Sequence, residues 1–294
     1  MAAPPGRDVG LGALGSCFES QHQLGSLALI YVHVLAVYYG VSYYLHYVSP
    51  QRHTKNVRSP AATQPEAQTE RDALRAVFPL AIKALCLWGA HALHTCGWGI
   101  MSDGPILASW GVVDLLKAAA TVLALDFFHD TWFYFVHRWL HTPTMMRYVH
   151  YIHHESRVPS AFTGYSFHWF EAIVMFGNSI LEIFLFPMSA KLQYVYELWA
   201  IVIHIGGHCG WEIAPHIPTA GYILWWATGG WRRSQKLLNN VHHHDLHHAH
   251  PRCHFSLYFT HWDSLLGTMH ESWGKQLEQE NQAGGSVSFK TRAS

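Results

Sequence analysis

The sequence is poor in charged side chains and has no excess of either sign. Only 13% of its 294 residues are Asp, Glu, Lys or Arg, about half the usual share in a soluble protein. Nineteen basic residues balance nineteen acidic ones, so the chain lacks the positive surface that binding to nucleic acid requires. Half of the residues are apolar and 14% are aromatic, which indicates a protein partly solvated by lipid.

Cysteine patterns that bind zinc or form a disulfide framework are also missing. The chain has five cysteines, an odd number, and none stands three positions from another as in Cys-x-x-Cys. This favours a reducing, cytosol-facing location for the active side of the protein. No His-Glu-x-x-His segment occurs, which counts against a zinc protease.

Two apolar runs are long enough to span the roughly 30 Å hydrocarbon core of a bilayer. Leu24–Val48 contains no charged side chain, and Ala76–Met101 contains only Lys83. We expect both runs to be membrane helices. The polar, basic segment between them, Gln51–Arg75, is predicted to face the cytosol by the positive-inside rule.

Three further apolar segments are less suited to a full span. Ile106–Leu125 is interrupted by Asp114 and Lys117, a spacing that lets the two side chains pair on a tilted or interfacial helix. Trp169–Met188 and Leu192–Ile205 are both short and are joined by a turn. They are predicted to form a helical hairpin that enters the bilayer and returns to the same side.

These patterns predict an all-α fold, a polytopic membrane helical bundle, to which the spacing of the histidines in the second half of the chain adds a cytosol-facing, histidine-rich di-metal site. The chain divides into a flexible tail (1–23), transmembrane helices with a cytosolic loop (24–125), a catalytic region with the membrane hairpin (126–270), and a polar C-terminal tail (271–294).

Histidine is abundant, and most of it lies in the second half of the chain. Of 25 histidines, 19 lie at or after His129, and six fall between His242 and His250. Within that run His244, His247 and His248 have the spacing i, i+3, i+4, which places three imidazoles on one helical face. The same spacing recurs in His150-Tyr-Ile-His153-His154. Such repetition points to metal ligation, because imidazole is the commonest metal ligand.

A polar stripe precedes these triplets. At 100° per residue, five polar side chains fall on one face of an otherwise apolar helix. They are Asp126, Asp130, Tyr134, His137 and His141. Burying such a row in an apolar helix is costly, so a functional role is favoured.

The histidines that have ligand spacing exceed what one metal ion requires. A tetrahedral site uses at most four protein ligands, so this number implies two metals, for which iron, copper, nickel and zinc remain open. The candidate ligands are His137, His141, His150, His153, His154, His208, His244, His247 and His248, with His204 and His168 as additional candidates. Asp126, Asp130, Asp245 and Glu171 either orient these imidazoles or make ordinary structural contacts. We take Asp130, Tyr134 and Asp245 as candidates for catalysis.

Three histidine boxes follow one another in the chain: His137-x-x-x-His141, His150-x-x-His153-His154 and His244-x-x-His247-His248. This order, with Trp262-Asp263-x-Leu-Leu-Gly267-Thr268 after it, resembles the fatty acid hydroxylase superfamily of membrane di-iron enzymes. It is most similar to the sterol desaturase and sterol methyl oxidase branch, over roughly residues 110 to 270. The resemblance implies two Fe ions, O₂ as co-substrate, and electrons from an external reductase through cytochrome b5. It also implies a multi-pass protein of the endoplasmic reticulum with a membrane lipid as substrate.

Carried over to this chain, the family's ligand boxes fall on the histidines named above. His208 is similar to the histidine that the family places between its second and third boxes. His168 stands where many members have His-Pro-x-Glu, but Trp169 replaces the proline and Glu171 remains.

The function that the resemblance implies is hydroxylation or desaturation of an unactivated C–H bond in a sterol. Which of the two occurs depends on small differences in the position of the substrate carbon. Hydroxylation of a sphingoid base or a fatty acyl chain is an alternative. A membrane metal transporter or metal-buffering protein is an alternative of another class, although it would tolerate irregular spacing.

Overall fold

The computed structural model describes residues 21–49, 64–107, 109, 111–211, 219–227 and 238–273. Helices dominate these residues, and no strand longer than an isolated bridge occurs among them. The predicted tails lie mostly outside the described residues, as does much of the predicted cytosolic loop. The expected all-α fold is therefore confirmed for the described part of the chain.

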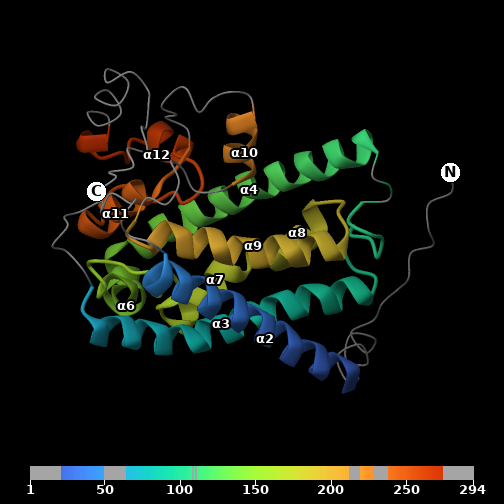
Figure 1. Cartoon of the computed structure of the whole chain (residues 1–294), viewed down its shortest axis with the longest axis horizontal. Coiled ribbons are helices and arrows are strands. Elements are labelled where there is room, and N and C mark those ends of the chain that lie inside the picture. The colour runs from blue at the N-terminus through green and yellow to red at the C-terminus, as the bar shows by residue number, and fades with distance from the viewer. Residues whose placement is uncertain are drawn as a thin grey trace, which may run out of the picture.

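Four long helices form the body of the molecule: α2 (Gln21–Tyr43, continued by the π-helical turn Tyr44–Val48), α3 (Glu66–Thr95), α4 (Val112–Leu140) and α9 (Ala190–His208). Shorter elements complete it: α5 (Pro143–Met145), a π-helical turn (Met146–His150), α6 (Tyr151–His154), a 3₁₀ turn (Thr163–Tyr165), α7 (Trp169–Phe176), α8 (Asn178–Leu185), α10 (Ala220–Ala227), α11 (Val241–Ala249) and α12 (His261–Leu265). Figure 1 shows α6 and α11 gathered at the end of the bundle where α4 and α9 finish. Histidines distant in sequence therefore meet at this end.

Helices occur at both predicted membrane segments, but the second begins and ends earlier than predicted. Residues Ser26–Val48 and Glu66–Thr95 form helices long and apolar enough to cross a membrane. The second begins ten residues before the predicted Ala76, because Pro65 immediately precedes the first turn of α3 and favours helix initiation there. It ends at Thr95, before Gly97 with a φ of 84°.

Two predicted boundaries in the middle of the chain are wrong. Ile106–Leu125 and the polar stripe after it were expected as separate segments, but Val112–Leu140 is one helix because it contains neither glycine nor proline. Conversely, Trp169–Met188 is not a single helical segment. It is divided into α7 and α8 at Gly177, and α9 follows as the longer helix.

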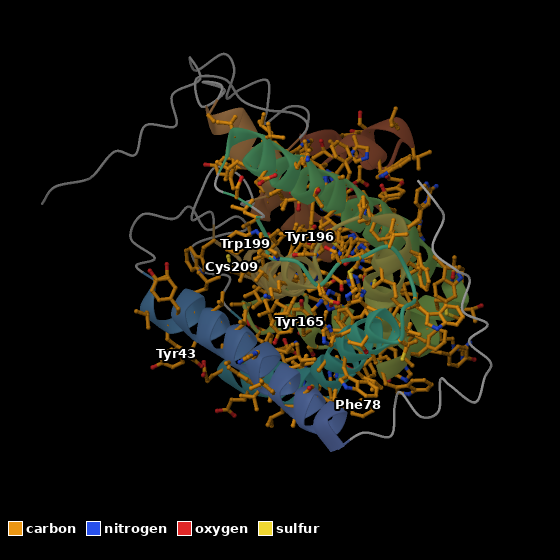
Figure 2. All side chains as sticks on the ribbon, turned by 90° about the vertical axis from the view of Figure 1, so that its right-hand side faces the viewer. Tyr43, Phe78, Tyr165, Tyr196, Trp199 and Cys209 are labelled. Carbon is orange, nitrogen blue, oxygen red and sulfur yellow. The ribbon has the colours of Figure 1, made fainter. Side chains whose placement is uncertain are left out.

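Apolar and aromatic side chains make up most of the interior of the bundle, which also contains buried charged residues. Figure 2 shows Tyr165 within the bundle, whereas Tyr43 and Phe78 lie at its periphery. Tyr165 is only 2% exposed and packs against His204 and Phe176, while Phe78 is 61% exposed. Exposed apolar side chains on α3 and α4, Leu116 among them, give the outer surface a character compatible with lipid.

Candidate metal centre

Five histidines from four elements converge at one end of the bundle. Their ligand nitrogens all lie within 4.8 Å of one another, and most of the rings are buried. Helix α4 and the residue directly after it contribute two of them, and the π-helical turn, α6 and α11 contribute one each. This five-histidine group consists of His137, His141, His150, His154 and His247.

The spacing of the nitrogens in this group fits one metal ion. The Nε2 atom of His141 lies 3.3 Å from that of His137 and 3.2 Å from that of His154. The Nε2 atoms of His247 and His154 are also 3.2 Å apart. Two nitrogen ligands about 2.1 Å from one ion, at tetrahedral or octahedral angles, lie about 3.0 to 3.4 Å apart. The ring nitrogens thus surround a position that a cation can occupy.

Backbone carbonyls after α11 hold two of these rings in the orientation that ligation needs. His137 Nδ1 donates to the carbonyl of Phe255 at 2.9 Å, and His247 Nδ1 donates to that of Cys253 at 2.7 Å. A proton held on Nδ1 leaves the lone pair of Nε2 directed into the group. The tautomer required of a metal ligand is therefore selected by the protein itself.

A carboxylate orients a third ring. His150 Nδ1 donates to Glu171 Oε1 at 2.8 Å, and both side chains are buried. The opposite nitrogen, His150 Nε2, is buried and has no hydrogen-bond partner among the described residues. Because buried polar atoms are rarely left unsatisfied, this atom is consistent with a missing cationic partner. Of the two readings open for Glu171 from sequence, the orienting one agrees with this contact.

Four more histidines form a second, fully buried group beside the first. The four-histidine group consists of His153, His208, His244 and His248, again with ligand nitrogens within 4.8 Å. The Nε2 atom of His208 lies 3.3 Å from that of His153 and 2.8 Å from that of His244. His208 Nδ1 donates to the carbonyl of His204, and His248 Nδ1 donates to that of Ser156. Each of these two rings therefore also directs Nε2 inward.

The two groups are neighbours. The rings of His154 and His248, one from each group, have centroids 5.0 Å apart, and those of His153 and His154 are 5.5 Å apart. Two ions bound in the two groups would therefore lie next to each other. This arrangement is suited to a dinuclear centre rather than to two independent sites.

Burial keeps the imidazoles in the form that binds metal. It lowers the pKa of His137 to about 4 and that of His154 to about 3. Burial and the neighbouring rings likewise lower the pKa of His244 well below its usual range. At neutral pH these imidazoles are uncharged, as metal ligation requires. Nine neutral rings with converging lone pairs form a donor set that fits a pair of soft-to-borderline divalent cations.

His204 and His168 belong to neither group. His204 Nε2 donates to the carbonyl of Gly164 at 2.6 Å, and its ring stacks on His208 at 4.7 Å, so it supports a candidate ligand. His168 Nδ1 accepts the amide of Phe170 at 3.1 Å and caps the first turn of α7. The structure therefore does not bring these two candidates to the ligand positions, because both rings have other partners.

The carboxylates of Asp126 and Asp130 on α4 hydrogen-bond to other parts of the bundle and not to the candidate ligands. Asp130 accepts the amides of Leu257 and Tyr258 at 3.1 and 2.8 Å. Asp126 accepts the hydroxyl of Tyr196 at 2.9 Å. For these two residues, the structural reading of the sequence agrees with the contacts.

The other two residues proposed for catalysis lie on helices that carry candidate ligands. The hydroxyl of Tyr134 accepts from Arg138 at 3.0 Å and lies 3.1 Å from Thr268 Oγ1. Asp245 is buried on α11, between the histidines of that helix. Their proposed catalytic roles stay predictions.

A third cluster of titratable side chains was missed by the sequence reasoning. His129 Nε2 lies 2.5 Å from Glu182 Oε1 and 3.4 Å from Glu197 Oε1. Lys83 Nζ lies 2.6 Å from Glu197 Oε2. The signal that could have revealed this cluster is that Lys83, Glu182 and Glu197 lie within apolar segments, where an ionisable side chain is costly and needs a partner.

The part of the chain that carries the site is similar to known proteins. The family model described as fatty acid hydroxylase matches residues 122–268, which include both histidine groups. The chain is 29% identical over 156 residues to the Delta(7)-sterol 5(6)-desaturase ERG3B of Gibberella zeae, covering 51% of this chain and 42% of that protein. It is 28% identical over 149 residues to methylsterol monooxygenase 1 of Rattus norvegicus, with coverage of 51% and 46%.

A third relative is cholesterol 25-hydroxylase of Homo sapiens, 31% identical over 143 residues with coverage of 46% of each chain. The chain spans about half the length of the curated relatives it matches. No solved structure matches.

Proposed function

Because the chain belongs to the fatty acid hydroxylase family, we propose that it is a membrane oxidoreductase that hydroxylates or desaturates an unactivated C–H bond of a lipid. A sterol is the favoured substrate, since several relatives with different reactions are named for sterols. The observation that carries the proposal is the pair of adjacent histidine groups with inward-directed nitrogens.

Iron is the metal that we propose for both groups. Two bound iron ions would supply the activation of O₂ that such an oxidation requires, with electrons from an external donor such as cytochrome b5 and its reductase. The imidazole donor set suits iron but does not distinguish it from other transition metals. The choice of iron therefore rests on the family.

The chain's own residues prepare the site for this chemistry. Glu171 and the carbonyls of Phe255 and Cys253 hold protons on Nδ1 of three rings, so that each Nε2 remains a donor to metal. Buried aromatic side chains, among them Phe255 and Phe167, pack against candidate ligands and limit access of water. Preorganisation of this kind reduces the rearrangement needed when metal binds.

We further propose a polytopic protein of the endoplasmic reticulum with the histidine end in the cytosol. Helices α2 and α3 support membrane insertion by length and composition. Arg75, near the start of α3, pairs with Glu155 at 2.7 Å, directly after His154. The basic end of a candidate span thus lies on the histidine side, which the positive-inside rule assigns to the cytosol.

A metal transporter or buffer is a weaker proposal. A metal sink needs accessible ligands, whereas the candidate ligands here are mostly buried and several have oriented tautomers. Sphingoid-base or fatty acyl hydroxylation remains the alternative within the same chemistry.

Metal analysis and lipid profiling together test the proposal. The purified protein should contain two irons per chain and consume O₂ and reductant in the presence of its lipid. Cells that lack the protein should accumulate the precursor lipid, and re-expression of wild-type protein or His270→Ala should remove it. His270 hydrogen-bonds to exposed Ser272 outside both groups, so His270→Ala is the matched control for His247→Ala. Variable zinc content without turnover would overturn the proposal.

A further inference from the structure

A charged cluster in the middle of the bundle lies beside a small, partly open cavity. Lys83 of α3, His129 of α4, Glu182 of α8 and Glu197 of α9 meet there, and none of them is more than 9% exposed. Asn178 donates to Glu182 at 3.3 Å. This charged cluster lies outside both histidine groups and plays no part in the chemistry proposed above.

The cavity next to the cluster has a volume of about 40 Å³. Its wall is mainly apolar and aromatic, and Lys83, His129 and Asn178 provide polar groups. A water molecule needs about 10 to 15 Å³ of such volume, so the space holds a hydroxyl group with one or two carbons. An apolar pocket with a few convergent polar groups is the usual form of a small-molecule site.

Lys83 has hydrogen-bonding capacity to spare at this wall. An ammonium group has three N–H donors, and the only acceptor that the described residues show for Lys83 is Glu197 Oε2 at 2.6 Å. The ring of Phe176, whose centroid is 4.9 Å from Nζ, takes a second direction. A buried ammonium that borders a cavity in this way is suited to donate to an oxygen placed there.

The charges of the cluster select against an anionic ligand. Glu182 and Glu197 contribute two negative charges, and Lys83 contributes one positive charge. His129 adds a second positive charge only when protonated, so the net charge is either zero or minus one. A carboxylate or phosphate would enter a buried site with no cation left to balance it. A neutral hydroxyl carries no such cost.

The cavity and a groove on the outer surface of α4 have one lining residue in common. Trp132 lines the cavity and also an open groove of about 310 Å³, which it shares with the aromatic residues Phe128, Phe135 and Trp139. The Trp132 indole N–H is shared between the carbonyls of Val174 and Met175 at 3.0 and 3.1 Å. The groove offers an apolar surface for the body of a lipid whose polar end reaches the cavity.

On another side, the cavity borders the surroundings of the candidate metal centre. His204 also lines it, and the ring of His204 stacks on that of His208 in the four-histidine group. The cavity therefore lies between the charged cluster and the surroundings of the candidate metal centre. A ligand held at Lys83 would be anchored one residue layer from the histidines.

We propose that this cavity receives the hydroxyl-bearing end of a neutral lipid alcohol, with Lys83 donating to the hydroxyl oxygen and Trp132 flanking the apolar body. The inference rests on the proposed function, since it names the class of lipid that the same enzyme accepts. Lys83 is then a specificity-determining residue, and Glu197 and His129 are positioning residues that hold it.

Binding measurements on metal-free protein test this without any turnover. The probes are cholesterol, 5α-cholestane, which lacks the hydroxyl group, and cholesteryl sulfate, which replaces it with an anion. A hydrogen bond to a charged group contributes about 1.5 to 3 kcal/mol, so wild type should bind cholesterol about 10-fold or more tightly than cholestane. Cholesteryl sulfate should bind no more tightly than cholestane.

The variant Lys83→Met/Glu197→Gln removes the ion pair without leaving one charge buried alone. It should bind cholesterol and cholestane with similar affinity, while Lys191→Met, which changes an exposed lysine of α9, should keep the wild-type preference. If the double variant does not fold, the three-probe comparison on wild type still decides. Equal affinity of wild type for cholesterol and cholestane, or tight binding of the sulfate, would overturn the inference. Failure of the proposed function would instead show as absent iron and absent O₂-dependent turnover in wild type.

Discussion

Replacing Glu171 by Gln should weaken metal binding without removing a single metal ligand. Glu171 Oε1 accepts from His150 Nδ1 at 2.8 Å in a buried site, so it stabilises the tautomer that directs Nε2 to the metal. The amide of Gln carries no charge, and its NH₂ group can donate to Nδ1, which would shift the proton to Nε2 and block ligation. Loss of such an orienting partner typically lowers metal affinity by about 10- to 100-fold. This corresponds to about 1.4 to 2.7 kcal/mol.

The assay is competition of the purified protein with a chelator of known affinity, followed by metal analysis. Asp103→Asn is the matched control, because Asp103 Oδ1 also lies 2.8 Å from a histidine, His94 Nε2, but its side chain is 90% exposed and lies outside the metal centre. Glu171→Gln should lose metal from the five-histidine group at chelator concentrations that leave Asp103→Asn fully loaded. Equal retention of metal by the two variants would refute the reasoning, as would equal loss.

Four other substitutions probe the site and its support. His247→Ala and His248→Ala should each lower metal content by about one equivalent and abolish turnover with membrane insertion unchanged; retention of two ions would show the ligand assignment to be wrong. Gly164→Ala should lower both metal affinity and the melting temperature, because the new Cβ would lie 2.9 Å from His204 Cδ2, and wild-type values would contradict this contact. Asp72→Ala should destabilise the protein by about 2 to 4 kcal/mol, because the fully buried carboxylate accepts from several hydroxyl groups; an unchanged denaturation midpoint would count against it.

The candidate ligands could be found from sequence because metal-ligand spacing on a helix is local. All nine histidines chosen for their spacing occur in the two groups. The distribution between the groups was not foreseen, since each triplet was expected to act as one face. Instead, the i, i+4 pairs His150/His154 and His244/His248 each stay together, whereas His153 and His247 join the other group.

Helix geometry explains this division. At 100° per residue, positions i and i+4 are separated by about 40°, but i+3 and i+4 are separated by about 100°. With two adjacent metal positions, the i+3 residue of each triplet, His153 or His247, points to the neighbouring position. The sequence determines these angles. It does not show that a second metal position lies beside the first, because that depends on how α6 packs against α11.

The structure places the two additional candidates in neither group, for a related reason. His168 has a suitable residue type and position in the chain, but with Trp169 in place of proline it caps α7 through Phe170. His204 has i, i+4 spacing to His208, yet its Nε2 is occupied by the Gly164 carbonyl. Competing partners from other parts of the chain are invisible to local spacing.

The sequence alone therefore determined three features: helical elements, lipid-compatible surfaces and nine imidazoles at ligand spacing. All three follow from residue type and short-range periodicity. What only the tertiary structure decided is which imidazoles share a metal position, which carboxylate orients them, and that Lys83 meets Glu197 and His129 beside a cavity. These contacts join residues that are tens of positions apart, and their geometry is set by the packing of whole helices against one another rather than by any local pattern.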